Sequence, residues 1–341
     1  MKIAVIGAGS WGTALAGMLG EKHKNVVLWA RSAKLADEMT ERRENTAYLP
    51  GVKLPDSVKF TADVNVAAVD ASIVVVVTPS HAMRETAAKL AGVIKKDTIV
   101  VCASKGLETG TLKRMSEVVV EEIPVVAERI AVLSGPNHAE EVGLKQPSAT
   151  VVASPWRNVA ETVQDAFITS YFRVYTNPDI IGVELGGALK NIIALGSGVA
   201  EGLGFGDNAK AAFMTRGLAE IGRLGTAMGA NSLTFAGLSG VGDLIATCTS
   251  CHSRNRRAGL MVADGKSVDQ IQTATNMVVE GIRSTIAAYE LARRYDVEMP
   301  ITQEIYRVLY EGANPLEAVS QLMSRGRTHE NEEVAIIENW L

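Results

Sequence analysis

The chain has 341 residues, a formal net charge of −4, 47% hydrophobic and 21% charged residues, which is typical of globular proteins and leaves room for two domains. Such a balance argues against a nucleic-acid-binding surface, and no uninterrupted apolar run reaches the ~18 residues that a membrane span needs. Three cysteines fit a reducing compartment better than a disulfide framework. We therefore expect a cytoplasmic protein, with neither nucleic acid nor a membrane among its partners.

The first half of the chain alternates short apolar runs with amphipathic stretches, as expected for a parallel sheet covered by helices. Turn-forming or polar residues follow these runs, and ligands bind at the carboxyl ends of the strands in open α/β sheets. We predict an α/β fold whose N-terminal domain, residues 1–177, is a Rossmann-type, doubly wound and mostly parallel sheet. The predicted strands are 2–6, 25–29, 72–77, 98–102, 130–133 and 149–153.

The first strand leads directly into Gly7-Ala8-Gly9-Ser10-Trp11-Gly12, which has the G-x-G-x-x-G spacing of dinucleotide-binding turns. Gly7 allows the tight turn, Gly9 leaves the backbone open to a pyrophosphate, and Gly12 lets the following helix lie close to the sheet. The N–H groups at the start of that helix suit phosphate oxygens. A plain glycine-rich turn is the alternative, but the strand before the motif and the helix after it favour a bound dinucleotide.

The residue after the second strand bears on the cofactor's ribose. NAD-specific sites usually have Asp or Glu about 20 residues beyond the glycines, whereas this strand ends in Ala30-Arg31-Ser32 without an acid. Arg31 suits a 2′-phosphate or the face of an adenine ring; the alternative is a solvated surface arginine. We expect NADP(H), NAD(H) or both as the cofactor, with NADPH favoured.

The second half of the chain has helical patterns only, and we find no convincing strand after residue 177. Asn177-Pro178 predicts an N-cap followed by proline at the first helical position. We predict an all-helical substrate-binding domain over residues 178–341, with the active site in the cleft between the two domains. The predicted helices are 179–200, 208–228, 239–247, 254–264, 267–273, 281–294, 300–311 and 315–324.

Two lysines are candidates for chemistry. Lys190 lies in a helical stretch that is apolar nearly all round, which predicts burial, and a buried lysine is either paired or functional because burial disfavours its charge. With a lowered pKa it could supply the proton that reduction of a ketone needs, and Gly186-Gly187 beside it would admit another backbone or a nicotinamide. Lys105 follows a predicted strand and could point into the same cleft. The alternative for Lys190 is a side chain that reaches solvent from the edge of the helix. The alternative for Lys105 is a solvated surface lysine.

Residues 237–257 combine a glycine turn, the acid Asp243, hydroxyl groups and the cluster Ser253-Arg254-Asn255. Arg and Asn side chains beside a serine suit a phosphate, and a basic surface patch is the alternative.

The same region contains Cys248-Thr249-Ser250-Cys251-His252, which matches the C-x-x-C-H pattern of covalent haem attachment. Further soft ligands are lacking nearby, so we interpret the match as accidental and expect no metal.

With these residues the chain resembles the bacterial NAD(P)-dependent glycerol-3-phosphate dehydrogenases over essentially its whole length. The resemblance implies reversible reduction of dihydroxyacetone phosphate to sn-glycerol 3-phosphate, which supplies glycerophospholipid synthesis, and a homodimer. The segments that carry it are 7–16 (GAGSWGTALA), 104–107 (SKGL), 134–139, 184–191, 208–218 (NAKAAFMTRGL), 240–249 (GVGDLIATCT) and 253–257 (SRNRR).

The same resemblance implies roles for individual residues. Lys190 would be the catalytic acid and base, assisted by Lys105 and Asp243 at the oxygens of the substrate. The family usually has Ser or Thr where this chain has Asn137, and because asparagine also donates and accepts hydrogen bonds we expect the substrate contact to survive there. The implied substrate contacts are Lys105, Gly135, Asn137, Lys190, Asp243, Ser253, Arg254 and Asn255. The implied cofactor contacts are Gly7, Gly9, Ser10, Trp11, Gly12, Arg31, Lys105, Ala139, Arg254, Val278 and Glu280.

Two other functions stay open at the level of the residues. One is a two-domain dehydrogenase that acts on a 3-hydroxy acid, and such an enzyme would not depend on a phosphate in its substrate. The other is a regulator that senses a dinucleotide without turnover. A regulator would need a DNA-binding or partner-binding module, which the sequence does not reveal.

Overall fold

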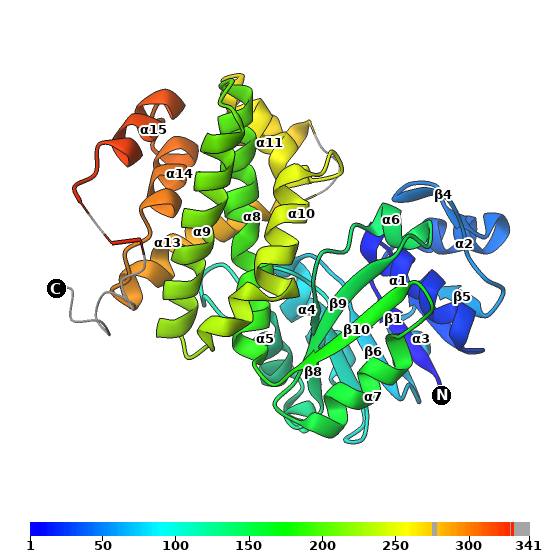
Figure 1. Ribbon diagram of the computed structural model, residues 1–341. Coiled ribbons are helices and arrows are strands. Elements are labelled where there is room, and N and C mark those ends of the chain that lie inside the picture. The colour runs from blue at the N-terminus through cyan, green and yellow to red at the C-terminus, as the bar shows by residue number, and fades with distance from the viewer. Residues whose placement is uncertain (275–277, 328, 331–341) are drawn as a thin grey trace.

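The computed structural model describes residues 1–274, 278–327 and 329–330. Figure 1 shows a twisted sheet with flanking helices from the first half of the chain, and a bundle of helices from the second half. The sheet has eight strands in the order β10-β9-β8-β7-β6-β1-β2-β5. They are β1 (Ile3–Ile6), β2 (Val26–Trp29), β5 (Val58–Thr61), β6 (Ile73–Val76), β7 (Ile99–Cys102), β8 (Ile130–Ser134), β9 (Ser148–Ala153) and β10 (Phe172–Asn177).

The strand directions confirm the predicted fold class. In the sheet, the six strands β5, β2, β1, β6, β7 and β8 are each parallel to the next. The strand β9 is antiparallel to β8, and β10 is parallel to β9. All six predicted strands are present. The central strands β1, β2, β6 and β7 are buried along their whole length, because helices cover both faces of a doubly wound sheet. Their carboxyl ends therefore meet at one edge.

The sequence prediction misses β5 and β10, the strands at the two edges of the sheet, and a small hairpin of β3 (Glu44–Asn45) and β4 (Leu49–Lys53). In β10 the buried residues Phe172 and Val174 alternate with exposed neighbours. An edge strand with one covered face is short of apolar residues, so its pattern resembles that of a loop. The missed strands do not change the predicted fold class.

Helices form a layer on each face of the sheet. Apolar side chains of α1, α2, α6 and α7 pack on one face, and those of α3, α4 and α5 pack on the other. The bounds are α1 (Ser10–Lys22), α2 (Ala33–Arg42), α3 (Val64–Ala68), α4 (Met83–Leu90), α5 (Met115–Glu122), α6 (Ala139–Gly143) and α7 (Arg157–Phe167).

The helical part is built around α8 (Ile180–Gly202), which α9, α10, α11 and α13 surround. Among the described residues α8 is the helix with the length and apolar composition to cross a membrane, but 89% of its apolar window is buried inside the protein. It is therefore the core helix of the bundle. The other helices are α9 (Asp207–Ala227), α10 (Asp243–Thr249), α11 (Arg254–Ala263), α12 (Val268–Thr273), α13 (Glu280–Arg294), α14 (Pro300–Tyr310) and α15 (Pro315–Met323).

The start of α8 corrects one prediction. Asn177 does not cap the helix, because it is the last residue of β10 and is held in extended backbone by pairing with β9. The cap is Asp179, whose carboxylate accepts the N–H of Gly182 at 2.9 Å. Pro178 therefore precedes the cap instead of occupying the first helical position. The assignment of residues 1–177 and 178–341 to two domains stays a prediction.

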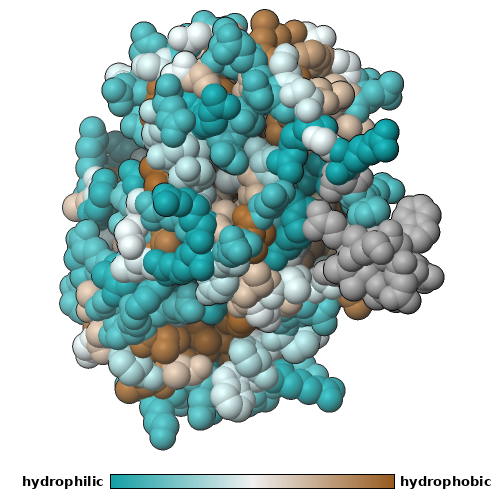
Figure 2. Space-filling model, turned by 90° about the vertical axis from the view of Figure 1, so that its left-hand side faces the viewer, coloured by the Kyte–Doolittle hydropathy of each residue, from teal (hydrophilic) through white to brown (hydrophobic). Residues whose placement is uncertain are grey.

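The surface at the helical end of the molecule is mixed in polarity. Figure 2 shows hydrophilic residues over most of this face, with hydrophobic residues among them. The helix α15 lies at this end in Figure 1, and its Leu316 and Met323 side chains are exposed. Exposed apolar side chains are common on protein surfaces and define no site by themselves.

Candidate active site

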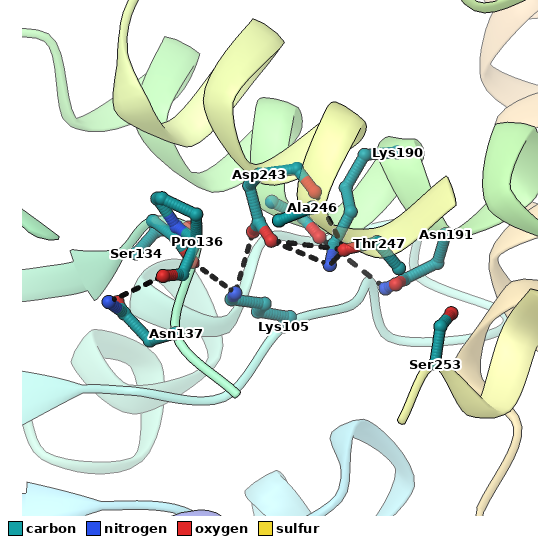
Figure 3. Close-up of polar contacts among 12 residues, drawn as sticks. Lys105, Ser134, Pro136, Asn137, Lys190, Asn191, Asp243, Ala246, Thr247 and Ser253 are labelled. Atoms are coloured by element: carbon teal, nitrogen blue, oxygen red, sulfur yellow. Dashed lines mark hydrogen bonds and ion pairs between the residues drawn. The ribbon is translucent and has the colours of Figure 1, made fainter. Parts of the chain in front are cut away.

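The predicted chemical residues of the two halves of the chain meet at the carboxyl edge of the sheet (Figure 3). Lys105 follows β7, and the turn at residues 134–137 follows β8. The helices α8 and α10 approach these strand ends from the other side and supply Lys190 and Asp243. The structure thus brings together residues that lie in four separate segments of the sequence.

Asp243 is the centre of this cluster. Its Oδ2 accepts a hydrogen bond from the Nζ of Lys105 at 2.6 Å, and its Oδ1 accepts one from the Nζ of Lys190 at 2.8 Å. The Asp243 side chain is 2% exposed and Lys190 is 6% exposed. Lys105 is less deeply buried and also donates to the carbonyl oxygen of Gly135 at 2.9 Å. Two ammonium groups therefore share one buried carboxylate.

Burial and charge act in opposite directions on these groups. Burial alone would raise the pKa of the Asp243 carboxyl, but the two neighbouring ammonium groups outweigh it and lower this pKa below its usual value. Burial lowers the pKa of Lys190 to about 8, an effect that Asp243 opposes and the charge of Lys105 assists. A lysine with a pKa near 8 can both donate and accept a proton close to neutral pH.

Two neighbours complete the surroundings of Lys190, and the sequence analysis did not single them out. Thr247 Oγ1 accepts a hydrogen bond from Lys190 and donates to the carbonyl oxygen of Asp243. Asn191 follows Lys190 on α8 and accepts a hydrogen bond from Asn255 at 2.8 Å. Thr247 lies one helical turn after Asp243, so the i, i+4 spacing was a usable signal.

The residues predicted to hold the substrate phosphate lie at the start of α11. Ser253 is its N-cap and accepts the N–H of Arg256. Asn255 is buried and joins α8 to α13, since its side-chain oxygen accepts the N–H of Gly281 at 2.8 Å. Arg254 donates to the carbonyl oxygen of Val278 at 3.1 Å, and no ion pair joins it to a carboxylate within the described residues. Its charge is thus available to an anion.

The turn after β8 lies directly beside Lys105. Gly135 has a φ of +151°, and a Cβ there would lie 3.0 Å from the Cα of Thr150, so this position favours glycine. Asn137 uses its amide N–H groups within the protein, donating to the carbonyl oxygens of Ala149 at 2.9 Å and Pro136 at 3.0 Å. The hydroxyl of Ser134 is buried and has no hydrogen-bond partner among the described residues. It was not predicted as a site residue.

A cavity of about 530 Å³ opens next to this turn. It is lined in part by Pro136, His138, Ala246 and residues 249–252. The rings of His138 and His252 lie 6.0 Å apart, and burial lowers the pKa of His138. Lys105, Lys190 and Asp243 do not line this cavity, so it lies beside their cluster and not at it.

The glycine turn after β1 has the geometry that a dinucleotide needs. Gly7 has a φ of +126°, and a Cβ at Gly12 would lie 1.9 Å from the Gly7 carbonyl oxygen. Gly12 therefore allows the start of α1 to pack against the turn at Gly7. The predicted contact of this glycine was with the sheet, which is farther away. A Cβ at Gly9 would meet no atom within 4 Å. The N-terminus of α1 has no side-chain cap, so its N–H groups are open to a phosphate.

The remaining predicted residues of the first half surround this turn. Ser10 is buried, and its hydroxyl donates to the carbonyl oxygen of Tyr48 at 2.7 Å. Trp11 packs against the apolar core and lies near the ring of Phe172. Ala139 is buried at the start of α6, which packs on α1. Tyr48, from the hairpin that was not predicted, is a further neighbour of the turn.

The second half of the chain also contacts the strand ends. The carboxylate of Glu280 accepts the hydroxyl of Ser80 at 2.8 Å and the N–H of Ser80 at 3.2 Å, at the tip of β6. Val278, whose carbonyl accepts from Arg254, is close by in the chain. Asn276 and Met277, which precede Val278 in the chain, lie outside the described residues.

Two smaller expectations can also be compared with the structure. Gly186 admits another backbone, since a Cβ there would lie 2.7 Å from the carbonyl oxygen of Ser239. In the C-x-x-C-H match, Cys248 is buried and Cys251 is exposed. Among residues 1–274, 278–327 and 329–330, no three His, Cys, Asp or Glu side chains are grouped as metal ligands would be.

The sheet, the open glycine turn and the buried lysine–aspartate cluster define a nicotinamide-dependent oxidoreductase with a helical second half. Residues 2–160 match the family model of the NAD-dependent glycerol-3-phosphate dehydrogenase N-terminus, and residues 179–320 match that of the C-terminus. The chain belongs to this family of NAD(P)-dependent dehydrogenases.

Individual relatives agree with the family models. A glycerol-3-phosphate dehydrogenase (NAD(P)+) of Pelotomaculum thermopropionicum is 57% identical over 98% of this chain and 96% of its own length. One of Desulfitobacterium hafniense is 58% identical over 98% and 95%. The crystal structure of glycerol-3-phosphate dehydrogenase from Coxiella burnetii is similar with a TM-score of 0.90 and 38% identity, covering 95% of this chain and 99% of that one.

Proposed function

We propose that this chain reversibly reduces dihydroxyacetone phosphate to sn-glycerol 3-phosphate with NAD(P)H, at the site formed by Lys105, Lys190 and Asp243. The observation that carries the proposal is the single buried carboxylate that accepts a hydrogen bond from an ammonium on each side. The family and the names of the relatives support the substrate and the cofactor class.

Lys190 is the proposed catalytic acid. The nicotinamide, when bound, supplies the hydride that adds to the carbonyl carbon. The Lys190 ammonium donates its proton to the carbonyl oxygen, so that ketone, hydride and proton together give the secondary alcohol. In the reverse direction the neutral amine accepts the hydroxyl proton. A pKa of about 8 leaves both protonation states accessible near neutral pH.

Lys105 and Asp243 prepare the site for this proton transfer. Asp243 orients both ammonium groups, because each of its oxygens accepts from one of them. Lys105 is fixed a second time by the carbonyl of Gly135, so its charge is held in place before the reaction. A preorganised cation of this kind stabilises the negative charge that develops on a carbonyl oxygen during reduction.

The phosphate of the substrate would bind at the start of α11. Arg254 supplies a guanidinium that engages a backbone carbonyl but no carboxylate among the described side chains. The N-terminus of α11 adds the positive end of a helix of ten residues. Ser253 can still donate its hydroxyl proton, since its oxygen only accepts within the protein. These groups suit a phosphate dianion better than a neutral alcohol.

A steady-state assay tests the proposal. NADPH or NADH should be consumed with dihydroxyacetone phosphate and much more slowly with dihydroxyacetone, which lacks the phosphate. The substitution Lys190→Ala should lower kcat by about 10²-fold or more, with the dissociation constant of the cofactor nearly unchanged. Lys96→Ala, at an exposed lysine between α4 and β7, is the matched control. Failure of the wild-type protein to oxidise either cofactor with dihydroxyacetone phosphate would end the proposal.

Three finer points belong to the same proposal. The exposed Arg31, at the end of a strand that no acid follows, supports a preference for NADPH. A cytoplasmic location and a role in supplying glycerophospholipid synthesis follow from the family resemblance, as does a homodimer. Light scattering on the purified protein would test the last point, because the chain alone has a mass of 36.2 kDa and a dimer has twice that mass.

A further inference from the structure

A groove of about 550 Å³ lies at the carboxyl end of β2. The strand β2 is the neighbour of β1, with Trp29 in register with Ile6, so the groove is one strand away from the glycine turn. In a dinucleotide bound at such a turn the adenosine extends toward the end of β2. The groove is lined by Trp29, Arg31, Ala62, Asp63, Val64 and Lys89.

The groove has two cations and one acid. Arg31 is exposed, and its guanidinium has no hydrogen bond or ion pair among the residues described. Lys89 comes from α4 and pairs with Glu85 one turn earlier, at 2.6 Å and with side chains 47% and 74% exposed. Exposed pairs of this kind contribute little to stability, so Lys89 can exchange its partner at low cost.

The acid of the groove already has a structural task. Asp63 is the N-cap of α3, and its Oδ1 accepts the N–H groups of Asn65 at 2.8 Å and Val66 at 3.4 Å. Its negative charge is therefore stabilised by the positive end of that helix. Arg31 and Lys89 are therefore the groups in the groove that can bind an anionic ligand.

We propose that Lys89 is a second cation beside Arg31 for the 2′-phosphate of NADPH, and thus determines cofactor specificity together with Arg31. The proposal rests on the proposed function, because it takes the cofactor from there. A 2′-phosphate carries about −1.5 to −2 charges near pH 7, which one guanidinium does not neutralise. A 2′-hydroxyl carries no charge, so Lys89 stays with Glu85 when NADH binds.

Binding measurements test the proposal without turnover. The purified protein would be titrated calorimetrically with 2′,5′-ADP and with 5′-AMP, which differ by the phosphate in question, and then with NADPH and NADH. Lys89→Gln should weaken binding of 2′,5′-ADP and NADPH about three- to tenfold, with 5′-AMP and NADH unchanged. Glu85→Gln should strengthen binding of the two phosphorylated ligands, because it releases Lys89.

Two control lysines sharpen the test. Lys95→Gln removes another exposed lysine that is paired with a carboxylate. This lysine precedes β7 and so lies at the amino end of the strands, and its removal should change nothing. Lys34→Gln removes a lysine of α2 whose pairing with Glu38 is longer, at 3.9 Å. If Lys34→Gln showed the phosphate-specific loss and Lys89→Gln did not, the assignment to Lys89 would be overturned. Equal losses for phosphorylated and unphosphorylated ligands in Lys89→Gln would overturn it too.

This result is separable from the proposed reaction. If the protein failed to reduce dihydroxyacetone phosphate but lost 2′,5′-ADP affinity in Lys89→Gln, the reaction would be wrong and the role of Lys89 correct. If the reaction proceeded and the ratio of NADPH to NADH affinity stayed the same in Lys89→Gln, the role of Lys89 alone would be wrong.

Discussion

Replacing Asp243 by asparagine would remove the charge that holds the buried Lys190 and the half-buried Lys105. Asparagine keeps the size of the side chain and one acceptor oxygen, but not the negative charge next to Lys105 and Lys190. Burial and the charge of Lys105 would then act on Lys190 without the group that opposes them. We therefore expect the pKa of Lys190 to fall below its value of about 8.

The size of this fall follows from the geometry. The ammonium of Lys190 lies 2.8 Å from Oδ1 of Asp243, and two unit charges about 4 Å apart interact by about 4 kcal/mol at an effective dielectric constant of 20. An effective dielectric constant of about 20 already includes relaxation of the protein and entry of water, so loss of the Asp243 charge removes more than the energy of one pKa unit. A pKa unit corresponds to about 1.4 kcal/mol, so the pKa of Lys190 should fall by about one unit or more.

The pH dependence of kcat/KM measures this shift in both directions of the reaction. Reduction needs the ammonium form, so kcat/KM for dihydroxyacetone phosphate should decrease as the pH rises through the pKa of Lys190. Oxidation of glycerol 3-phosphate needs the neutral amine, so its kcat/KM should increase through the same pH. In Asp243→Asn both limbs should move to lower pH by about one unit or more, alongside a lower maximum rate.

An exposed aspartate offers a matched control. Asp97→Asn, in the turn before β7, changes the same charge far from the site and should leave both limbs in place. The thermal midpoint of Asp243→Asn shows whether the variant folds, and the position of a limb does not depend on how much protein is active. Limbs that stayed at the wild-type pH, or moved to higher pH, would refute the assignment of this ionisation to Lys190.

Three further predictions concern the turn, a buried acid and the departure from the family pattern. Gly9→Ala should keep the thermal midpoint but weaken cofactor binding, measured by calorimetry, tenfold or more. Gly12→Ala should instead destabilise the fold, because its Cβ would meet the Gly7 carbonyl oxygen. Burial raises the pKa of Glu220 to about 7. The free energy of unfolding should therefore decrease as the pH rises from about 4.5 to about 7. In Glu220→Gln, denaturant titrations should show a weaker dependence of this free energy on pH. Asn137→Ser should lower the free energy of unfolding by about 1 kcal/mol through lost hydrogen bonds to the backbone, with kcat changed less than threefold.

The sequence predicted the central part of the fold well, because its signals are strong there. The strands β1, β2, β6 and β7 are buried on both faces, so each is a nearly unbroken apolar run between turn residues. The glycine spacing after β1 then located the dinucleotide turn. Local patterns were sufficient for these elements because burial on both faces leaves little room for other residue types.

Predictions failed where tertiary contacts decide the local structure. Asn177 has the side chain of a good N-cap, but pairing of β10 with β9 takes this residue into the strand, and Asp179 caps α8 instead. Asn137 shows the same dependence on tertiary contacts, because its amide N–H donates to the carbonyl oxygen of Ala149 on β9; its contact with the substrate stays a prediction. In both cases a residue 12 or more positions away along the chain sets the outcome, and local propensity contains no information about it.

The cluster at Asp243 shows what sequence alone leaves open. The partners Lys105 and Lys190 are 138 and 53 residues from Asp243 in the chain, so no spacing rule could join them. A buried Lys190 was predicted to be either paired or functional, and the structure shows that it is paired with Asp243, while its catalytic role stays a prediction. Burial and the charge of Lys105 lower the pKa of Lys190, and Asp243 raises it. A pKa of about 8 results from this balance, and the proposed proton transfer in both directions depends on it.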